Sequence, residues 1–218
     1  MGFLITFEGV EGSGKTTQIR RLADKLTVAG HRTVLTREPG GCMIADKIRS
    51  VLLDADNLGM QPLTELMLYA AARSQHVSEV IMPALATGSI VLCDRFTDAT
   101  IAYQHFGRGI DRTTIDELNL LACQSVRPDL TILIDCDVAI GLNRAKKRIE
   151  ASQGPREERF ELEAISFHQR VRDGYVQLAA EEPQRILTVY ADGSIDDIAR
   201  NITEQVFNFI KAGSRAFC

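Results

Sequence analysis

The residues from Gly9 to Thr16 constrain the fold of this chain more than any others. They read Gly-Val-Glu-Gly-Ser-Gly-Lys-Thr, which fits the pattern G-x-x-x-x-G-K-[ST] without a mismatch. A strand-like apolar run precedes them and a helical pattern follows, which is the context that this pattern requires. The glycines allow a tight turn in which backbone N–H groups converge, and the positive end of the helix dipole points to the same place. We therefore predict a phosphate-binding loop between a buried strand and a helix.

This loop supplies the residues that we expect to bind the phosphates of ATP. Lys15 can reach the β- and γ-phosphates, and the hydroxyl of Thr16 can bind Mg²⁺. A glycine-rich turn with an incidental lysine is the competing interpretation, and the flanking strand and helix disfavour it. The expected ATP-binding residues of the loop are Gly9, Val10, Glu11, Gly12, Ser13, Gly14, Lys15, Thr16 and Thr17.

Short apolar runs alternate along the chain with longer helical patterns, which is typical of βαβ units and a parallel sheet. We expect strands at residues 3–8, 32–36, 89–93, 130–135 and 185–190. We expect helices at residues 18–29, 64–86 (with a kink or break at Pro83), 139–149, 160–180 and 195–210. The predicted fold class is α/β, a five-stranded parallel sheet flanked by helices, in a single domain spanning residues 1–218.

The polar segment at residues 150–159 separates two helical patterns and contains the breaker Gly154-Pro155. A solvated loop explains this composition, and so does a mobile lid beside a phosphate site.

The composition limits which partners this protein can bind and in which cellular compartment we expect it. The net charge is −4, so the chain has no overall attraction for nucleic acid or anionic lipid. The five cysteines form no CxxC pair, which favours reduced thiols over disulfides or a zinc site. No apolar run approaches the ~18 residues that span a bilayer, and the N-terminus lacks the features of a signal peptide. We expect a cytoplasmic protein that binds neither nucleic acid nor membranes.

The phosphate-binding loop alone does not distinguish a switch, a motor and a phosphoryl donor site. A GTPase would need an N/T-K-x-D segment, which is absent from the sequence. Motor ATPases carry much more sequence than this chain has. A small protein with this loop and an arginine-rich lid indicates a kinase of small molecules.

Three further clusters are expected at the carboxyl edge of the sheet, where parallel sheets bind ligands. One comprises residues 37–41, a second comprises residues 94–96, and a third is the pair Tyr69 and Arg73 on one helix face. Each contains an arginine, and arginines neutralise phosphates through paired hydrogen bonds. The clusters are therefore candidates for binding an anionic phosphoryl acceptor.

With these clusters in place, the chain resembles the thymidylate kinase family almost from end to end. The resemblance is carried by residues 7–18, by Arg-Glu-Pro-Gly-Gly at 37–41, and by Tyr69, Arg73, Gln75 and His76. It continues in Asp94-Arg95-Phe96, in Ala102-Tyr103-Gln104, and in Gly141, Leu142 and Arg144. It implies a P-loop nucleoside-monophosphate-kinase-like fold with a short lid at about residues 148–160, and a homodimer packed through long apolar helices. It also implies transfer of a phosphoryl group from Mg-ATP to dTMP.

The resemblance implies a role for each acceptor-side residue. Tyr69 would stack on thymine, Tyr103 would crowd the sugar 2′ position, and Glu11 would lie near the 3′-hydroxyl. The polar edge of the base would be read by Arg73, Thr100 and Gln104. The acceptor phosphate would be held by Arg37 and Arg95, and Asp94 would help to place Mg²⁺. Glu38 and Pro39 complete the expected substrate-binding residues.

The catalytic arginine of this family lies either in the phosphate-binding loop or in the lid. Here the variable loop positions 10–13 contain no basic residue. The lid must then supply the arginine, as in the bacterial branch, and Arg148, Arg156 and Arg159 are the candidates. With Lys15, Asp94 and Arg95 they form the expected catalytic set, and Arg144 is expected to contact ATP.

The sequence departs from the family pattern at Cys42 (usually threonine), Ala99 (commonly serine) and His105 (commonly glycine). Ala99 removes a hydrogen bond near the base, which weakens the expectation for the base more than for phosphoryl transfer. A kinase for another nucleoside monophosphate therefore stays open, as does a nucleotide-dependent switch without turnover.

Overall fold

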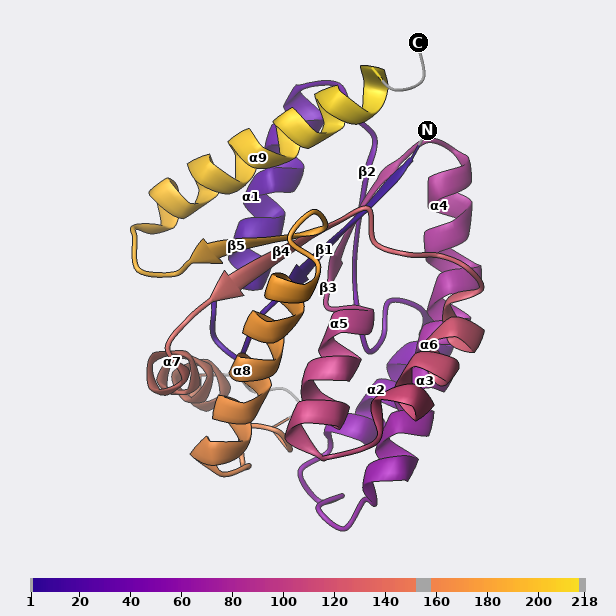
Figure 1. Ribbon diagram of the computed structural model, residues 1–218, viewed down its shortest axis with the longest axis vertical. Coiled ribbons are helices and arrows are strands. Elements are labelled where there is room, and N and C mark those ends of the chain that lie inside the picture. The colour runs from indigo at the N-terminus through magenta and orange to yellow at the C-terminus, as the bar shows by residue number, and fades with distance from the viewer. Residues whose placement is uncertain (1, 152–157, 216–218) are drawn as a thin grey trace.

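The computed structural model describes residues 2–151 and 158–215, arranged around one central sheet (Figure 1). The sheet has five strands in the order β2-β3-β1-β4-β5, and every adjacent pair is parallel. The strands are β1 (Phe3–Glu8), β2 (Thr33–Arg37), β3 (Ile90–Asp94), β4 (Leu130–Asp135) and β5 (Ile186–Tyr190). The predicted fold class is confirmed, and each strand lies within one residue of its expected bounds at either end.

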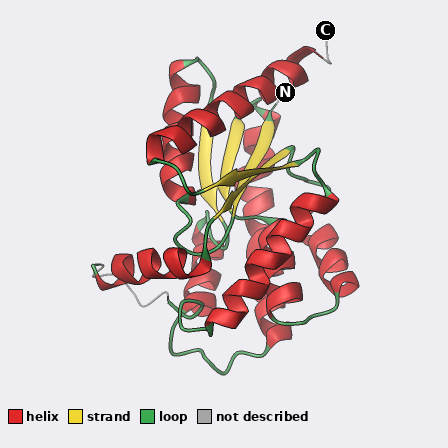
Figure 2. Cartoon of the chain, turned by 60° about the vertical axis from the view of Figure 1, so that its left-hand side comes forward, coloured by secondary structure: helices red, strands yellow, loops and turns green. Residues whose placement is uncertain are grey.

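Apolar side chains of the central strand enter both faces of the sheet, because successive residues of a strand point to opposite sides. In β1, Ile5 and Phe7 pack in one cluster with residues of α1 (Lys15–Val28) and α9 (Ile195–Arg215). Leu4 belongs to a cluster on the other side. Helices cover both faces (Figure 2), so the strands read as continuous apolar runs rather than alternating ones.

The remaining helices pack around the sheet, most of them toward its carboxyl edge (Figure 1). They are α2 (Met43–Leu53), α3 (Pro62–His76), α4 (Met82–Ala86), α5 (Thr97–Thr100), α6 (Arg112–Cys123), α7 (Val138–Glu150) and α8 (Ile165–Glu181). Two π-helical turns, η1 (Val77–Ile81) and η2 (Ile101–Gly107), continue α3 and α5. Sequence patterns missed α2 and α5, which follow the ends of β2 and β3, and α6, which follows η2.

Several expected helices have different limits in the structure. Helix α1 begins at Lys15 rather than at residue 18, and α9 extends to Arg215 rather than ending at residue 210. The stretch at 64–86 is interrupted by η1 rather than at Pro83, which lies in the first turn of α4, where its missing N–H costs no hydrogen bond. The helix expected from residue 160 begins only at Ile165, because the residues before it form turns. Among the described residues, no helix has both the length and the apolarity to cross a bilayer.

Candidate active site

A cleft of about 1340 Å³ opens at the carboxyl edge of the sheet and contains most of the predicted site residues. It lies where β1, β2 and β3 end, as expected for ligands of parallel sheets. The predicted residues that line it are Glu11, Gly12, Ser13, Gly14, Lys15, Thr16, Thr17, Arg37, Glu38, Pro39, Tyr69, Arg73, Asp94, Arg95, Thr100, Tyr103, Gln104, Arg144 and Arg148. Of the remaining predictions, Gly9 and Val10 lie buried at the base of the phosphate-binding loop, and Arg159 lies behind the cleft. Arg156 falls outside the described residues.

The phosphate-binding loop is held by close backbone contacts that only glycine permits. Gly12 has a φ of +68°, and a Cβ there would lie 2.0 Å from the carbonyl oxygen of Gly141 in α7. The loop therefore packs directly on α7, and α1 begins immediately after it at Lys15. The first N–H groups of α1 have no partner within the helix, so they are available to an anion.

Lys15 is buried and folds back on the loop that carries it. Its Nζ donates to the carbonyl oxygens of Gly9 at 2.9 Å and Val10 at 3.0 Å. Burial and the positive charge of Arg95 lower the pKa of Lys15 to about 8, against smaller opposing effects of nearby carboxylates. A phosphate anion bound in the loop would raise the pKa of Lys15 again and so stabilise its charged form. The position of this ammonium therefore suits phosphate binding.

Thr16 and Asp94 bring a hydroxyl and a carboxylate together at the mouth of the loop. The hydroxyl of Thr16 donates to Oδ2 of Asp94 at 2.8 Å. Oxygen ligands of these two kinds are those that Mg²⁺ takes from proteins, with water and substrate phosphates completing the shell. The donor set fits Mg²⁺ and contains no soft ligand that would favour zinc.

Arg95 extends from the end of β3 across the cleft toward Glu11 and two tyrosines. Its backbone has a φ of +70°, an uncommon value for a non-glycine residue. Its guanidinium donates to Glu11 Oε1 and to the Tyr175 hydroxyl, each at 3.1 Å, and stacks on the ring of Tyr103. Burial alone would raise the pKa of Glu11, but Arg95, His168 and the Tyr103 hydroxyl hold it well below its usual range. Glu11 is therefore a buried carboxylate anion inside the cleft.

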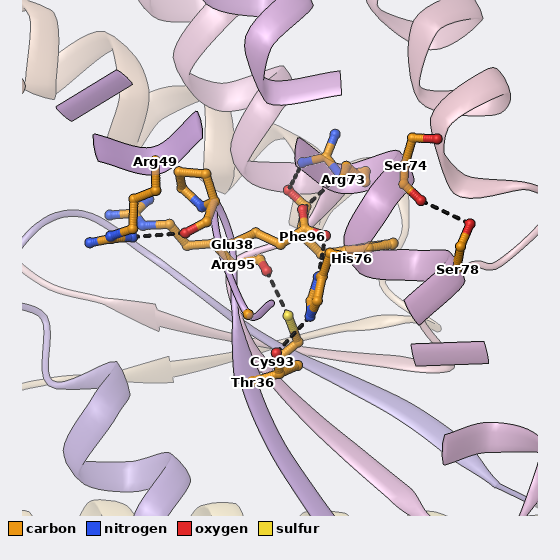
Figure 3. Close-up of polar contacts among 12 residues, drawn as sticks. Thr36, Glu38, Arg49, Arg73, Ser74, His76, Ser78, Cys93, Arg95 and Phe96 are labelled. Carbon is orange, nitrogen blue, oxygen red and sulfur yellow. Dashed lines mark hydrogen bonds and ion pairs between the residues drawn. The ribbon is translucent and has the colours of Figure 1, made fainter. Parts of the chain in front are cut away.

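Arg73 is fixed by a buried network that starts at Glu38 (Figure 3). Glu38 accepts from Arg73 Nε at 2.7 Å and lies 2.9 Å from His76 Nδ1. His76 in turn contacts the Thr36 hydroxyl at 2.6 Å. Because Glu38 and His76 are both buried, they position Arg73 with little freedom. The residues after β2 thus fix the position of Arg73 in the cleft.

The other end of the Arg73 guanidinium contacts the segment after β3. Nη2 donates to the carbonyl oxygen of Phe96 at 3.0 Å and to the Thr100 hydroxyl at 2.9 Å. Arg73, Thr100, Gln104 and Tyr69 all line the same part of the cleft. The structure therefore brings together the four residues expected to bind the base.

Two of the arginines expected in a lid, Arg148 and Arg159, occupy different environments. Arg148, near the end of α7, is 66% exposed in its side chain, lines the cleft, and contacts Glu161 only at 3.8 Å. Arg159 is 3% exposed, and its Nη1 lies 2.7 Å from Glu65 Oε2. Its Nε donates to the carbonyl oxygen of Leu52 at 2.5 Å. Arg148 is thus exposed beside the cleft, whereas Arg159 is buried and contacts both α2 and α3.

Sequence reasoning missed Phe160, which lines the cleft. Its ring lies 5.4 Å from that of Tyr103 and 6.4 Å from that of Tyr69, between centroids. The available signal was an aromatic residue directly after a polar segment. Arg49 also lines the cleft and donates to the Pro39 carbonyl at 3.0 Å, from the helix that the sequence did not predict.

Comparisons with known proteins agree with this geometry. A family model described as Thymidylate kinase matches residues 7–202. The chain is 65% identical over 206 residues to the thymidylate kinase of Pelobacter propionicus, covering 94% of both chains. It is 58% identical to that of Geobacter sulfurreducens, covering 95% of this chain and 98% of the relative. The crystal structure of thymidylate kinase from Ehrlichia chaffeensis matches with a TM-score of 0.76 and 34% identity, over 94% of this chain and 98% of that one. This chain belongs to the thymidylate kinase family.

Proposed function

We propose that this protein transfers the γ-phosphoryl group of ATP to the 5′-phosphate of dTMP, giving dTDP and ADP for dTTP biosynthesis. An oxygen of the acceptor phosphate forms a bond to the γ-phosphorus, and the bond to the β–γ bridging oxygen breaks as ADP leaves with the electron pair. The observation that carries the proposal is one cleft that is lined both by a complete phosphate-binding loop and by Tyr69 with the fixed polar groups of Arg73, Thr100 and Gln104.

Catalysis in this site consists of positioning and charge neutralisation, because a phosphate oxygen is already a competent nucleophile. Lys15 and the N–H groups of the loop bind the donor phosphates. Thr16 and Asp94 would hold Mg²⁺, which when bound neutralises phosphate charge. Asp94 has no need to act as a general base. Arg144, which lines the same cleft, adds positive charge beside the donor.

On the acceptor side, Arg37 and Arg95 bind the 5′-phosphate of dTMP. Tyr69 stacks on the base, and Arg73, Thr100 and Gln104 contact its polar edge. The ring of Tyr103 fills the space beside the sugar 2′ carbon, and Glu11 accepts from the 3′-hydroxyl. Glu38 acts through Arg73, and Pro39 shapes the turn that follows β2.

Arg148 is the lid residue best placed to stabilise the transferring phosphoryl group. It is exposed and lines the cleft, and its one ion-pair partner among the described residues, Glu161, is at the limit of the contact distance. We propose a single domain over residues 1–218, with a lid at about 148–160 that carries this arginine over the donor phosphates. Closure of the lid would exclude water and protect ATP from hydrolysis.

We further propose a homodimer that packs through neighbouring helices. Large apolar side chains are exposed on α2, α3 and α6, more than the isolated ones normal for a monomer surface. They are Met43, Ile44, Val51, Leu63, Met67, Leu120 and Leu121. A sedimentation experiment in solution tests this arrangement. We also infer a cytoplasmic location, in keeping with the four described cysteines, which are all free thiols.

An ADP-release assay with and without dTMP tests the proposed activity. A kinase needs the acceptor for turnover, while a nucleotide-dependent switch is indifferent to it. The Lys15→Ala variant is the negative control, with an expected loss of at least ~10²-fold in turnover because an oriented cation at the phosphates is removed. Equal ADP release with and without dTMP would contradict the proposed kinase activity.

A further inference from the structure

Glu65 is a buried carboxylate in α3 that lies behind the acceptor end of the cleft. Gln104 Nε2 donates to its Oε1 at 2.8 Å. Arg108 donates to both oxygens, from Nε to Oε1 at 3.3 Å and from Nη2 to Oε2 at 3.2 Å. Nη1 of Arg159 lies 2.7 Å from Oε2. Each oxygen thus has two donor nitrogens, which fills the roughly four acceptor positions of a carboxylate.

This arrangement fixes the orientation of the Gln104 amide. A carboxylate between two guanidinium groups only accepts hydrogen bonds, so the amide group that faces Glu65 must be the NH₂. The amide oxygen then remains for the cleft, which Gln104 lines. Within the described residues, no donor contacts Gln104 Oε1. Gln104 therefore offers a ligand a hydrogen-bond acceptor.

The guanidinium of Arg73 supplies the opposite polarity in the same part of the cleft. Its Nε donates to Glu38, its Nη2 donates to the Phe96 carbonyl and the Thr100 hydroxyl, and its Nη1 donates to Asn119 Oδ1 at 2.6 Å. A guanidinium has donors only and does not deprotonate in proteins. These four bonds leave one N–H of Arg73 Nη1 as a fixed donor from α3, and Gln104 supplies a fixed acceptor from η2 in the same cleft.

We infer that Glu65 is a positioning residue that makes the pocket select thymine or uracil over cytosine. Thymine and uracil carry an N–H at ring position 3 and a carbonyl at position 4. Cytosine carries a bare nitrogen at position 3 and an amino group at position 4. An acceptor from Gln104 and a donor from Arg73 match the first pattern and oppose the second. The inference rests on the proposed roles of Gln104 and Arg73. It adds the reason why the Gln104 amide does not flip and present its NH₂ group to cytosine.

The variant Glu65→Gln tests this inference with dUMP and dCMP as acceptors, since these differ only at the edge in question. Glutamine has a similar shape but carries both a donor and an acceptor, so the Gln104 amide can take either orientation. In the parent we expect kcat/KM to favour dUMP by about 10²-fold or more, because the wrong base leaves buried groups unpaired. In the variant we expect this ratio to fall at least about tenfold.

Two further variants separate positioning from a structural effect. Arg108→Lys disturbs the same carboxylate without touching Gln104, so it should lower the melting temperature and keep the dUMP/dCMP ratio within about threefold of the parent. Gln104→Leu removes the residue through which Glu65 acts. Adding Glu65→Gln to that background should then leave the ratio unchanged.

The outcomes distinguish this inference from the proposed function. If dTMP is phosphorylated but the parent treats dUMP and dCMP alike, the base-reading roles and the inference both fail while the kinase stands. If the parent discriminates and folded Glu65→Gln keeps its ratio within threefold, Glu65 does not position the amide. Should Glu65→Gln not fold, Glu65→Asp shortens the carboxylate while keeping its charge. This shortening withdraws the carboxylate from hydrogen-bond distance of Gln104, so the dUMP/dCMP ratio should fall at least about threefold. An unchanged ratio in that variant likewise overturns the inference.

Discussion

The hydroxyl of Thr16 donates a 2.8 Å hydrogen bond to Asp94, which joins the first turn of α1 to the end of β3. The two residues are 78 positions apart in the sequence, and the parallel pairing of β1 with β3 brings them together. Both present oxygen atoms at the mouth of the phosphate-binding loop. This contact places the proposed Mg²⁺ ligands between the donor side and the acceptor side of the cleft.

Replacing Asp94 with Asn should raise the Mg²⁺ concentration that gives half-maximal activity by about tenfold or more. The amide keeps the size of the side chain and its hydrogen bond to Thr16, but removes the negative charge that attracts the cation. A titration of activity with Mg²⁺ at saturating ATP and dTMP measures this. Thr16→Ser, which keeps the hydroxyl, serves as the matched control. An unchanged Mg²⁺ dependence in Asp94→Asn would show that this carboxylate does not place the metal.

Arg148 and Arg159 should respond to alanine substitution in opposite ways. Arg148→Ala should lower kcat and kcat/KM together by about 10²-fold, with little change in stability, because it removes a contact made in the transition state. Arg159→Ala should lower the free energy of unfolding by about 2–3 kcal/mol, because it takes one of two arginines from buried Glu65. Steady-state kinetics and urea denaturation of both variants measure this contrast. A near-parental kcat in Arg148→Ala would show that Arg148 does not stabilise the transferring phosphoryl group and that another arginine must do so.

The pH dependence of stability should be flatter in Glu8→Gln than in the parent. Burial, aided by the charge of Asp98, raises the pKa of Glu8 from 4.5 to about 8. Between these values the unfolded chain ionises Glu8 while the folded chain keeps it protonated, so its contribution to stability falls as pH rises. Glutamine does not titrate and can still bond the Phe96 N–H and the Tyr175 hydroxyl, which contact Glu8 at 2.7 and 2.8 Å. Urea denaturation from pH 5 to 8 compares the two proteins, and parallel profiles would contradict the assignment.

Much of the fold was predictable because its apolar runs are long and buried on both faces. The strands at residues 3–8 and 130–135 have the expected bounds. Their continuous apolar runs are typical of strands that are buried on both faces of a parallel sheet, and glycine, proline or charged residues flank these runs. Helix α2 was missed because its exposed face carries Met43 and Val51, which blurs the amphipathic period. The start of α8 was misplaced because Phe160 extends the apolar pattern into a turn that packs on the cleft.

The site was predictable where a local pattern carries the chemistry and less so where the contacts are long-range. The residues from Gly9 to Thr16 form the loop that their spacing indicates. The sequence alone did not distinguish the role of Arg148 from that of Arg159, because Arg148 lies just before the polar segment and Arg159 is its last residue. Burial against Glu65 distinguishes them, and that contact spans 94 positions of the chain. The partnership of Glu65 with Gln104 is of the same kind.

A direct comparison of natural nucleoside monophosphates as acceptors tests the central claim. The protein, ATP and Mg²⁺ would be incubated with dTMP, dUMP, dCMP, UMP, AMP or GMP, and the diphosphate product measured by chromatography. We expect dTMP to be the best acceptor, ahead of dCMP by about 10²-fold or more in kcat/KM, with dUMP ahead of UMP because a 2′-hydroxyl meets the ring of Tyr103. Comparable kcat/KM for dTMP and dCMP, or a better acceptor among the others, would contradict thymidylate as the substrate.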